Sequence, residues 1–404
     1  MKGLACLFIL CSMLSFAQAQ DYTPFQTKVR ALTALSKLDN PDQQREAQRV
    51  LLDSLKRTDQ IPITYKDSVA FIYIGQATAV DWMGDFNGWG YDKNFANAGK
   101  KIPGTNIWIL KASFPEDARL DYKIVLNKKS WILDPLNLNQ QWSGVGGGSP
   151  NSELRMPGYH DEPYQKERSD IPKGTVEHDI LFTSNMLGYQ ITYSVYLPPN
   201  ATGKLPVVYV TDGYEYLHPQ LGNMPVVLDN LIADKKIIPV MAVFIDHREP
   251  ANRTNNRRMQ ELVMNENYLK FFIDEFIPYI ELTYPAATER SKRAVIGSSV
   301  GGLSATYFAF SRPDIFGNAG IQSPSFFTRP QIYSLCDSPE GSKLKISMTS
   351  GVINDASEGG RRMIKILENN SCVYQYREVN QGHSWGNWKD LVDDILMDFF
   401  AVQP

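Results

Sequence analysis

The chain has 404 residues, of which 43% are hydrophobic and 11% are aromatic. A chain of this length and composition can bury a large core and is expected to fold as two or three domains. Its formal net charge is only −3, and the sequence has no basic run or basic helix. These features argue against a nucleic-acid-binding protein.

The first nineteen residues have the features of a signal peptide. Lys2 provides a positive charge, residues 4–16 form an apolar stretch, and Ala17-Gln18-Ala19 has the small residues of a cleavage site. We therefore expect export into a bacterial periplasm or the extracellular space. No membrane anchor is expected, because the apolar stretch is too short for a permanent transmembrane helix and neither Cys6 nor Cys11 lies at a lipoprotein-type cleavage point.

Two cysteines remain after the signal peptide, Cys336 and Cys372. An oxidising compartment could join them in a disulfide, but the sequence cannot fix the distance between them. The chain has no Cys/His spacing typical of a structural metal site, and no metal or cofactor is expected.

The region before the main domain falls into two segments. Residues 20–60 are predicted to form two short helices that break at Asn40-Pro41, because apolar residues recur there at helical spacing. Residues 61–160 contain short alternating segments separated by Gly, Asn, Asp and Pro, which is typical of a small Ig-like β-sandwich. A polar, Gly-rich stretch over 143–163 is expected to be a linker.

Residues 161–404 alternate between strand-like and helix-like segments. The apolar runs EHDILFTS, YQITYSVYLP, PVVYVTDG and PVMAVFID precede the helical run NENYLKFFIDEFIPYIELTY. Such alternation predicts an α/β domain with a mostly parallel sheet covered by helices on both faces.

The segment RAVIGSSVGGLSATYFAF places a serine where a buried strand turns into a helix. Residues 294–296 are apolar and favour a strand, and residues 303–310 continue as an apolar helix. Gly297 and Gly301 remove the Cβ atoms that a tight turn cannot accommodate, as in the Gly-x-Ser-x-Gly nucleophile elbow. We predict that Ser299 is a nucleophile at the tip of this turn.

A nucleophilic serine needs a general base, and the base needs an acid to hold its tautomer. His383 follows the strand-like VYQYREV and precedes the helix-like KDLVDDILMDFF, so it is predicted to be the base. Asp355, just past the strand-like KISMTSG, is the predicted acid, and Glu358 is the alternative. The order Ser, Asp, His is that of α/β-hydrolases. The competing interpretations are that Asp355 caps the following helix and that His383 is a solvated loop residue.

Two backbone N–H groups are candidates for an oxyanion hole, which stabilises the charge that develops on the ester oxygen. Val300 follows the nucleophile at the start of a helix. Tyr214 follows the strand PVVYVTDG, where Gly213 would let the chain turn back into the site. The alternative for Asp212-Gly213 is an ordinary turn at the end of a strand.

Further polar and aromatic residues lie near the predicted strand ends and could contact the substrate. Asp212 and Gly213 follow one strand, Gln322 follows GNAGI, and Trp385 lies two residues after His383. Core packing is the alternative for Trp385.

Several stretches together resemble the putative-esterase (esterase D) family of α/β-hydrolases. They are SNMLGYQITYSVYLPPN, YVTDGYEYL, RAVIGSSVGGLSATYFAFSRPDIFGNAGIQSPSFF and NQGHSWGNW, together with the helical run quoted above. The family includes feruloyl, acetyl xylan and enterochelin esterases. The resemblance implies an α/β-hydrolase fold, with the nucleophile at Ser299, the histidine at His383 and the acid at Asp355.

The segments GDFNGWG and LDYKIVLNKKSWILDPLN resemble the early-set domain of glycogen branching enzymes and isoamylases. Five tryptophans lie in this region: Trp82, Trp89, Trp108, Trp131 and Trp142. Aromatic faces can stack on sugar rings, so glycan binding is one hypothesis. The alternative, which we favour, is that tryptophans such as Trp89 and Trp108 form the sandwich core.

Together these features predict an exported serine ester hydrolase that removes feruloyl or acetyl groups from xylan through an acyl-enzyme. A siderophore trilactone esterase and a glycan-binding protein with a non-catalytic hydrolase scaffold are the alternatives. The expected partner is an ester-substituted glycan or a small aromatic ester.

Overall fold

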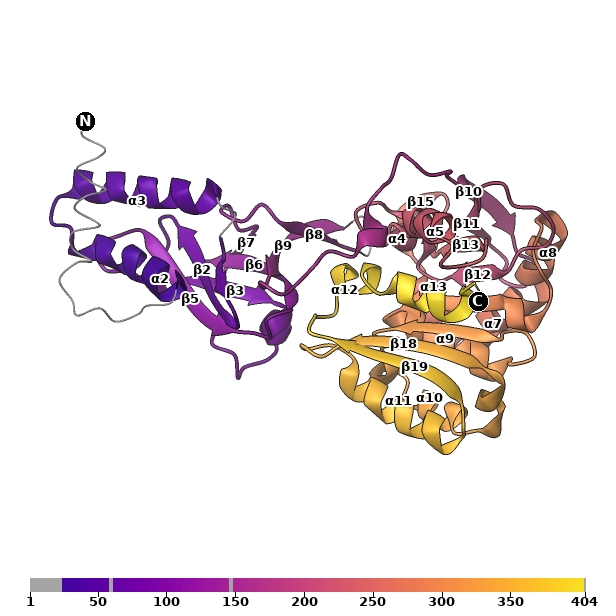
Figure 1. Cartoon of the computed structure of the whole chain (residues 1–404). Coiled ribbons are helices and arrows are strands. Elements are labelled where there is room, and N and C mark those ends of the chain that lie inside the picture. Colours follow the sequence, from indigo (N-terminus) through magenta and orange to yellow (C-terminus); the bar gives the residue numbers. More distant parts are fainter. Residues whose placement is uncertain (1–23, 58–60, 145–147, 403–404) are drawn as a thin grey trace. The chain divides into compact units, whose positions relative to one another are not determined.

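The computed structural model describes residues 24–57, 61–144 and 148–402, which form two compact units (Figure 1). The first unit comprises the residues up to 141 together with 150–160. The second comprises 142–149 and 161–404. The predicted signal peptide lies outside the described residues. Within the described part of the chain, no helix has both the length and the apolar character needed to cross a membrane.

Two helices come first among the described residues of the first unit. Asn40 Oδ1 accepts hydrogen bonds from the N–H groups of Asp42 and Gln43, and Pro41 is the first helical residue, so a new helix starts where the sequence predicted a break. Leu32 and Leu35 pack with apolar residues of the following strands. The helices are α2 (Pro24–Ala34) and α3 (Pro41–Arg57), with the short 3₁₀ turn η1 (Leu35–Lys37) between them.

In residues 61–144 and 148–155, nine strands follow, in two antiparallel sheets with the orders β1-β2-β5-β4 and β3-β6-β9-β8, and β7 pairs with β6. Phe71 of one sheet packs against Trp82 and Tyr122 of the other, so the sheets bury a shared aromatic core. The strands are β1 (Ile63–Tyr65), β2 (Ser68–Ile74), β3 (Val80–Gly84), β4 (Lys100–Lys101), β5 (Ile107–Ser113), β6 (Arg119–Leu126), β7 (Ser130–Ile132), β8 (Gln140–Ser143) and β9 (Ser149–Arg155).

The prediction of a linker over 143–163 is wrong for its central part. Residues 149–155 form strand β9, which pairs antiparallel with β6. Ser152 and Leu154 of this strand are fully buried. Polar residues such as Asn151 and Ser152 have little strand preference of their own, and the neighbouring strand supplies the hydrogen bonds that hold them.

The second unit contains an eight-stranded sheet in the order β10-β11-β13-β12-β16-β17-β18-β19. The pairs β10–β11 and β11–β13 are antiparallel. The remaining neighbours in this order, from β13 to β19, pair parallel. The α/β-hydrolase fold class predicted from the sequence is confirmed. The strands are β10 (Thr175–Thr183), β11 (Gln190–Leu197), β12 (Val207–Val210), β13 (Met241–Asp246), β16 (Arg293–Ser298), β17 (Asn318–Gln322), β18 (Lys345–Gly351) and β19 (Val373–Val379).

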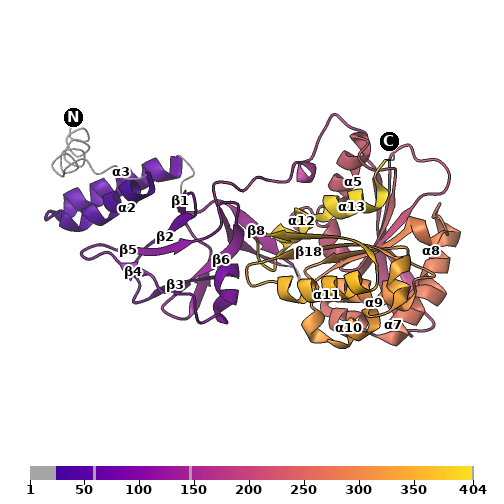
Figure 2. The same ribbon diagram turned by 60° about the horizontal axis from the view of Figure 1, so that its bottom comes forward.

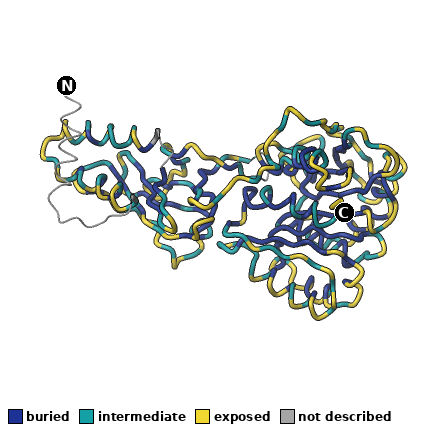
Figure 3. Tube along the Cα trace, in the orientation of Figure 1, coloured by how far each residue is buried: buried dark blue, intermediate teal, exposed yellow. Residues whose placement is uncertain are grey.

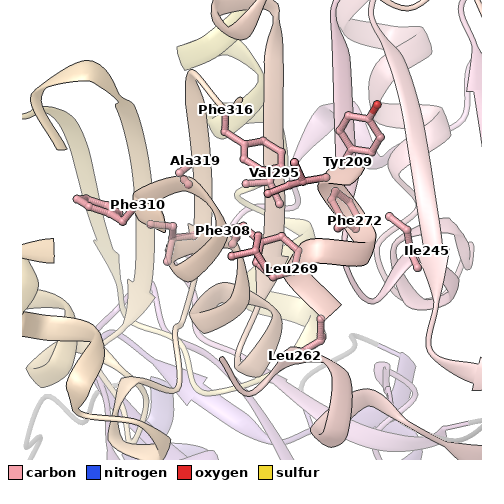
Figure 4. Packing of buried hydrophobic residues seen from close by; sticks show 14 of the residues in the cluster. Tyr209, Ile245, Leu262, Leu269, Phe272, Val295, Phe308, Phe310, Phe316 and Ala319 are labelled. Carbon is pink, nitrogen blue, oxygen red and sulfur yellow. The ribbon is translucent and has the colours of Figure 1, made fainter. Parts of the chain in front are cut away.

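Helices cover both faces of this sheet (Figures 1 and 2). On one face, α7 to α11 enclose a large apolar cluster, part of which is drawn in Figure 4, and on the other face α5, α12 and α13 enclose a second cluster. The helices are α4 (Gly213–Leu217), α5 (Met224–Ala233), α6 (Arg258–Leu262), α7 (Glu266–Phe271), α8 (Ile277–Thr283), α9 (Val300–Ser311), α10 (Gln331–Cys336), α11 (Ser357–Asn369), α12 (Trp385–Lys389) and α13 (Val392–Phe400). A short hairpin, β14 (Arg248–Glu249) and β15 (Asn252–Asn256), lies outside the sheet.

Burial follows this layered arrangement: the inner strands of the sheet are dark in Figure 3, whereas the edge strands β10 and β19 and the outer helices include many exposed residues. One π-helical turn, Phe272–Phe276, joins α7 to α8. Pro278 follows it and has no N–H to donate, which accounts for the irregular turn. Cys336 and Cys372 are both free thiols, so the disulfide that the sequence allowed is not formed.

Candidate active site

A sharp turn between β16 and α9 presents Ser299. This residue has φ 57° and ψ −117°, and Val300 begins the helix. A Cβ at Gly297 would lie 2.2 Å from Thr211 Oγ1, and one at Gly301 would lie 2.6 Å from the same atom. Only glycine fits at these two positions. The tight turn they allow holds Ser299 in a strained backbone conformation, with its hydroxyl within hydrogen-bonding distance of His383.

The side chains of Ser299, His383 and Asp355 form one hydrogen-bonded chain. Ser299 Oγ lies 2.9 Å from His383 Nε2, and His383 Nδ1 lies 2.6 Å from Asp355 Oδ1. His383 is on the loop between β19 and α12, and its side chain is 37% exposed, whereas that of Asp355 is completely buried. The imidazole therefore bridges a buried carboxylate and the hydroxyl.

The Asp355 carboxylate is held by further donors. Its Oδ2 accepts hydrogen bonds from Ser323 Oγ and from the Gly351 N–H, both at 2.6 Å, and from Asn387 Nδ2 at 3.2 Å. With Oδ2 occupied in this way, Oδ1 is left to orient the imidazole. The helix that follows starts at Ser357 without a side-chain cap, so Asp355 is not its N-cap. Glu358, the alternative acid, lies inside that helix, and the carboxylate bonded to His383 is that of Asp355.

The two proposed oxyanion donors lie at the starts of two helices. Val300 is the first residue of α9, and Tyr214 is the second residue of α4. N–H groups in the first turn of a helix have no acceptor within that helix. The helices follow β16 and β12, which are adjacent parallel strands, and therefore begin at the same edge of the sheet. A Cβ at Gly213 would lie 2.3 Å from the Ile245 N atom, so the close approach of this turn to β13 requires glycine.

Asp212 differs from the expectation of a substrate contact. It is 3% exposed, and its Oδ2 accepts a hydrogen bond at 2.7 Å from Arg258, which also donates to the Ser298 carbonyl at 3.1 Å. The ion pair thus ties the end of β12 to the end of β16. Burial, together with the Asp212 charge, raises the pKa of nearby Glu215 to about 7.

Gln322 and Trp385 also differ from the expectation, because both are used within the protein. Gln322 is fully buried, accepts a hydrogen bond from Tyr216 at 2.7 Å and donates one to the Trp388 carbonyl at 2.8 Å. Trp385 is 4% exposed and packs edge-on against Tyr216 and Trp388. Both side chains are therefore part of the packed interior and not of a surface that a substrate could contact.

Besides Asn387, which donates to Asp355, the sequence analysis missed two neighbours of Ser299 and His383. Ser325 Oγ lies 3.0 Å from Ser299 Oγ, and the Ser325 N–H donates to the Ser299 carbonyl at 2.9 Å. The Trp388 ring lies edge-on to the His383 ring, with 5.0 Å between centroids. The available signal for Ser325 was its place three residues beyond the end of β17, the strand next to the nucleophile strand.

Groups of His, Cys, Asp and Glu that could hold a metal ion are not found in the described part of the chain. The chemistry that the arrangement can perform is that of its own side chains: a base in contact with a hydroxyl, and N–H groups at helix starts nearby.

Comparisons with known proteins agree on one family. The family described as "Putative esterase" matches residues 184–399, more than half of the chain. The Iron(III) enterobactin esterase of Escherichia coli (strain K12) is 27% identical over an alignment of 340 residues, which with its gaps covers 74% of this chain and 81% of that protein. An endo-1,4-beta-xylanase/feruloyl esterase of Xylanibacter ruminicola is 29% identical over an alignment of 184 residues, which with its gaps covers 43% of this chain and 24% of that protein.

A solved structure has a similar fold. The ferric enterobactin esterase of Salmonella typhimurium superposes with a TM-score of 0.71 over 86% of this chain and 98% of that chain, at 18% identity. At this level of identity the likeness concerns the fold alone.

Proposed function

The chain belongs to the putative-esterase family, and from this membership we propose that it is a serine carboxylic-ester hydrolase that works through an acyl-enzyme. The observation that carries the proposal is the hydrogen-bonded chain from Ser299 through His383 to Asp355. Such an arrangement converts a weakly nucleophilic hydroxyl into a reactive one.

In the proposed reaction, Ser299 Oγ attacks the ester carbonyl carbon while His383 Nε2 takes the hydroxyl proton. The N–H groups of Val300 and Tyr214 stabilise the oxyanion, and Asp355 stabilises the imidazolium. His383 then gives the proton to the leaving alcohol, and a water molecule activated by His383 releases the acid from Ser299.

The proposed substrate is a feruloyl or acetyl ester on a plant cell-wall polysaccharide, met by an enzyme exported through a signal peptide at residues 1–19. Support comes from the similarity to the feruloyl esterase of Xylanibacter ruminicola and from the accompanying β-sandwich.

A siderophore trilactone is the second candidate substrate. It is favoured by the extent of similarity to an enterobactin esterase, which reaches 81% of that protein's length, whereas the match to the feruloyl esterase protein covers 24% of its length.

Glycan binding by the first unit is a separate part of the proposal. Trp82 and Trp108 are buried in the sandwich core, which favours the structural alternative for them. Trp131 is 51% exposed and stacks on Trp89, with 6.4 Å between ring centroids. Trp89 is half-buried, so a sugar ring could stack on the exposed Trp131 beside it. Electrophoresis in xylan-containing gels tests this glycan binding: the gel should retard the unchanged protein more than the Trp131→Ala variant.

The central experiment measures hydrolysis of p-nitrophenyl acetate and methyl ferulate. Ser299→Ala is expected to lower kcat/KM by about a thousandfold or more. Ser342→Ala, which removes a hydroxyl that donates to the Pro339 carbonyl in an exposed turn, is the control and should keep full activity. Full activity in Ser299→Ala would refute the proposal. Release of ferulate from arabinoxylan, compared with opening of a ferric-catecholate trilactone, ranks the two substrates.

A further inference from the structure

A pocket of about 450 Å³ lies beside the triad, on the side of its carboxylate. Asp355 and Pro324 both line it. Asp355 bonds to His383, and Pro324 precedes Ser325, whose hydroxyl lies 3.0 Å from Ser299 Oγ. The pocket therefore adjoins residues next to the triad, and its size is within the range of small-molecule sites, about 300–1,000 Å³.

The walls of this pocket are largely aromatic. Phe326 is buried and packs edge-on against Tyr333, with 5.5 Å between ring centroids. Phe327 also lines the pocket and is 81% exposed. A planar apolar group bound in the pocket would cover Phe327 and remove its surface from water, which is favourable.

Two charged side chains complete the lining, Glu358 and Arg362, one turn apart on α11. The Arg362 guanidinium lies 3.9 Å from the centre of the Tyr333 ring. Within the described residues, neither charge has a side-chain hydrogen bond or ion pair, whereas the adjacent Arg361 is held by Glu378 through two hydrogen bonds. The pocket thus offers an unused acceptor beside an unused set of donors.

Resting on the proposed ester hydrolysis, we propose that this pocket binds a hydroxylated aromatic ring of the substrate and that Glu358 and Arg362 select its hydroxyl group. A hydroxyl is both donor and acceptor, so it can donate to the Glu358 carboxylate and accept from the Arg362 guanidinium. An acetyl group is too small to cover the aromatic wall, so the pocket favours esters that carry an aromatic ring, on the acid or the alcohol, over esters that carry none.

The test uses two matched pairs of esters, because the ring could belong to the acid or to the alcohol. Methyl cinnamate and methyl 4-hydroxycinnamate differ on the acyl side, and phenyl acetate and 3-hydroxyphenyl acetate differ on the alcohol side. The unchanged enzyme is expected to prefer the hydroxylated member of one pair, measured as a ratio of kcat/KM values. Glu358→Ala and Arg362→Ala should each reduce that ratio by about ten- to a hundredfold, the effect of losing one hydrogen bond to a charged group.

Arg361→Ala is the matched control, because it removes a positive charge from the same helix outside the pocket, and it should leave the ratio unchanged. The pocket assignment is overturned if neither Glu358→Ala nor Arg362→Ala changes the ratio in either pair. A different result would contradict the proposed function itself: the Ser299→Ala variant would still hydrolyse these esters. If Glu358 were the triad acid, Glu358→Ala would abolish hydrolysis of all four esters alike.

Discussion

The hydroxyl of Ser325 lies 3.0 Å from the hydroxyl of Ser299, which also lies 2.9 Å from His383 Nε2. Ser299 has one proton, and it donates that proton to His383 when the imidazole acts as a base. Ser325 must then be the donor in its contact with Ser299. A donor at the nucleophile oxygen stabilises the negative charge that builds on this oxygen as its proton leaves.

We expect Ser325→Ala to lower kcat/KM for p-nitrophenyl acetate by about two- to tenfold, the effect of losing one neutral hydrogen bond. The loss should be far smaller than in Ser299→Ala, because the base and its orienting acid remain. Steady-state kinetics on both variants measures the difference. An unchanged rate in Ser325→Ala would mean that the contact contributes nothing to the reaction.

Asp355→Asn is expected to lower kcat by about a thousand- to ten-thousandfold while the protein stays folded. The amide cannot stabilise the imidazolium, and it can hold the imidazole in the wrong tautomer. The measurement is kcat together with the circular dichroism spectrum, which reports folding. Asp337→Asn, a substitution in an exposed turn, should keep full activity. Comparable rates in Asp355→Asn and the unchanged enzyme would exclude Asp355 as the orienting acid.

Sequence patterns were sufficient to predict candidate triad residues where a local signal marked the end of a strand. The Gly-x-Ser-x-Gly segment and the strand-like runs before Asp355 and His383 placed all three at the ends of parallel strands, and the structure brings them together. The contact of Asn387 with Asp355 arises only when separate strands and helices assemble, so no local pattern marks it, and the position of Ser325 after a strand does not by itself show that its hydroxyl reaches Ser299. The sequence also cannot show where a side chain points, and for this reason Gln322 and Trp385 were assigned to the substrate although they pack inward.

The glycines of the nucleophile turn should tolerate substitution to different degrees. A Cβ at Gly297 would lie 2.2 Å from Thr211 Oγ1 and 2.3 Å from the Gly301 carbonyl oxygen, so Gly297→Ala forces the turn to move. We expect this variant to lose about 3 kcal/mol or more of stability and most of its activity. In Gly302→Ala the closest atom, the Gln322 carbonyl oxygen, is 3.0 Å away, and the losses should be smaller. Urea denaturation and ester hydrolysis test the order, and equal effects would contradict it.

Asp393 connects the stability of the second unit to pH. It lies in the first turn of α13, is 4% exposed, and its Oδ1 has no hydrogen-bond partner among the described residues. Burial, with smaller contributions from the nearby Glu162 and Asp394 charges, raises its pKa to about 8. The native state therefore keeps a proton that the unfolded chain releases near its ordinary pKa of about 4.

Because the native state binds this proton more tightly, Asp393 stabilises the fold fully below its unfolded pKa, and that contribution is lost as pH rises toward 8, by at most about 1.4 kcal/mol per pH unit. Asp393→Asn removes the titrating group, so the free energy of unfolding should exceed that of the unchanged protein at pH 8 and approach it near pH 5. Urea denaturation at both pH values measures this difference. Asp398→Asn on the same helix should instead lower stability at pH 8, because Asp398 bonds to Arg377 at 2.7 and 3.0 Å. A difference between Asp393→Asn and the unchanged protein that does not grow with pH would show that Asp393 is ionised in the native state.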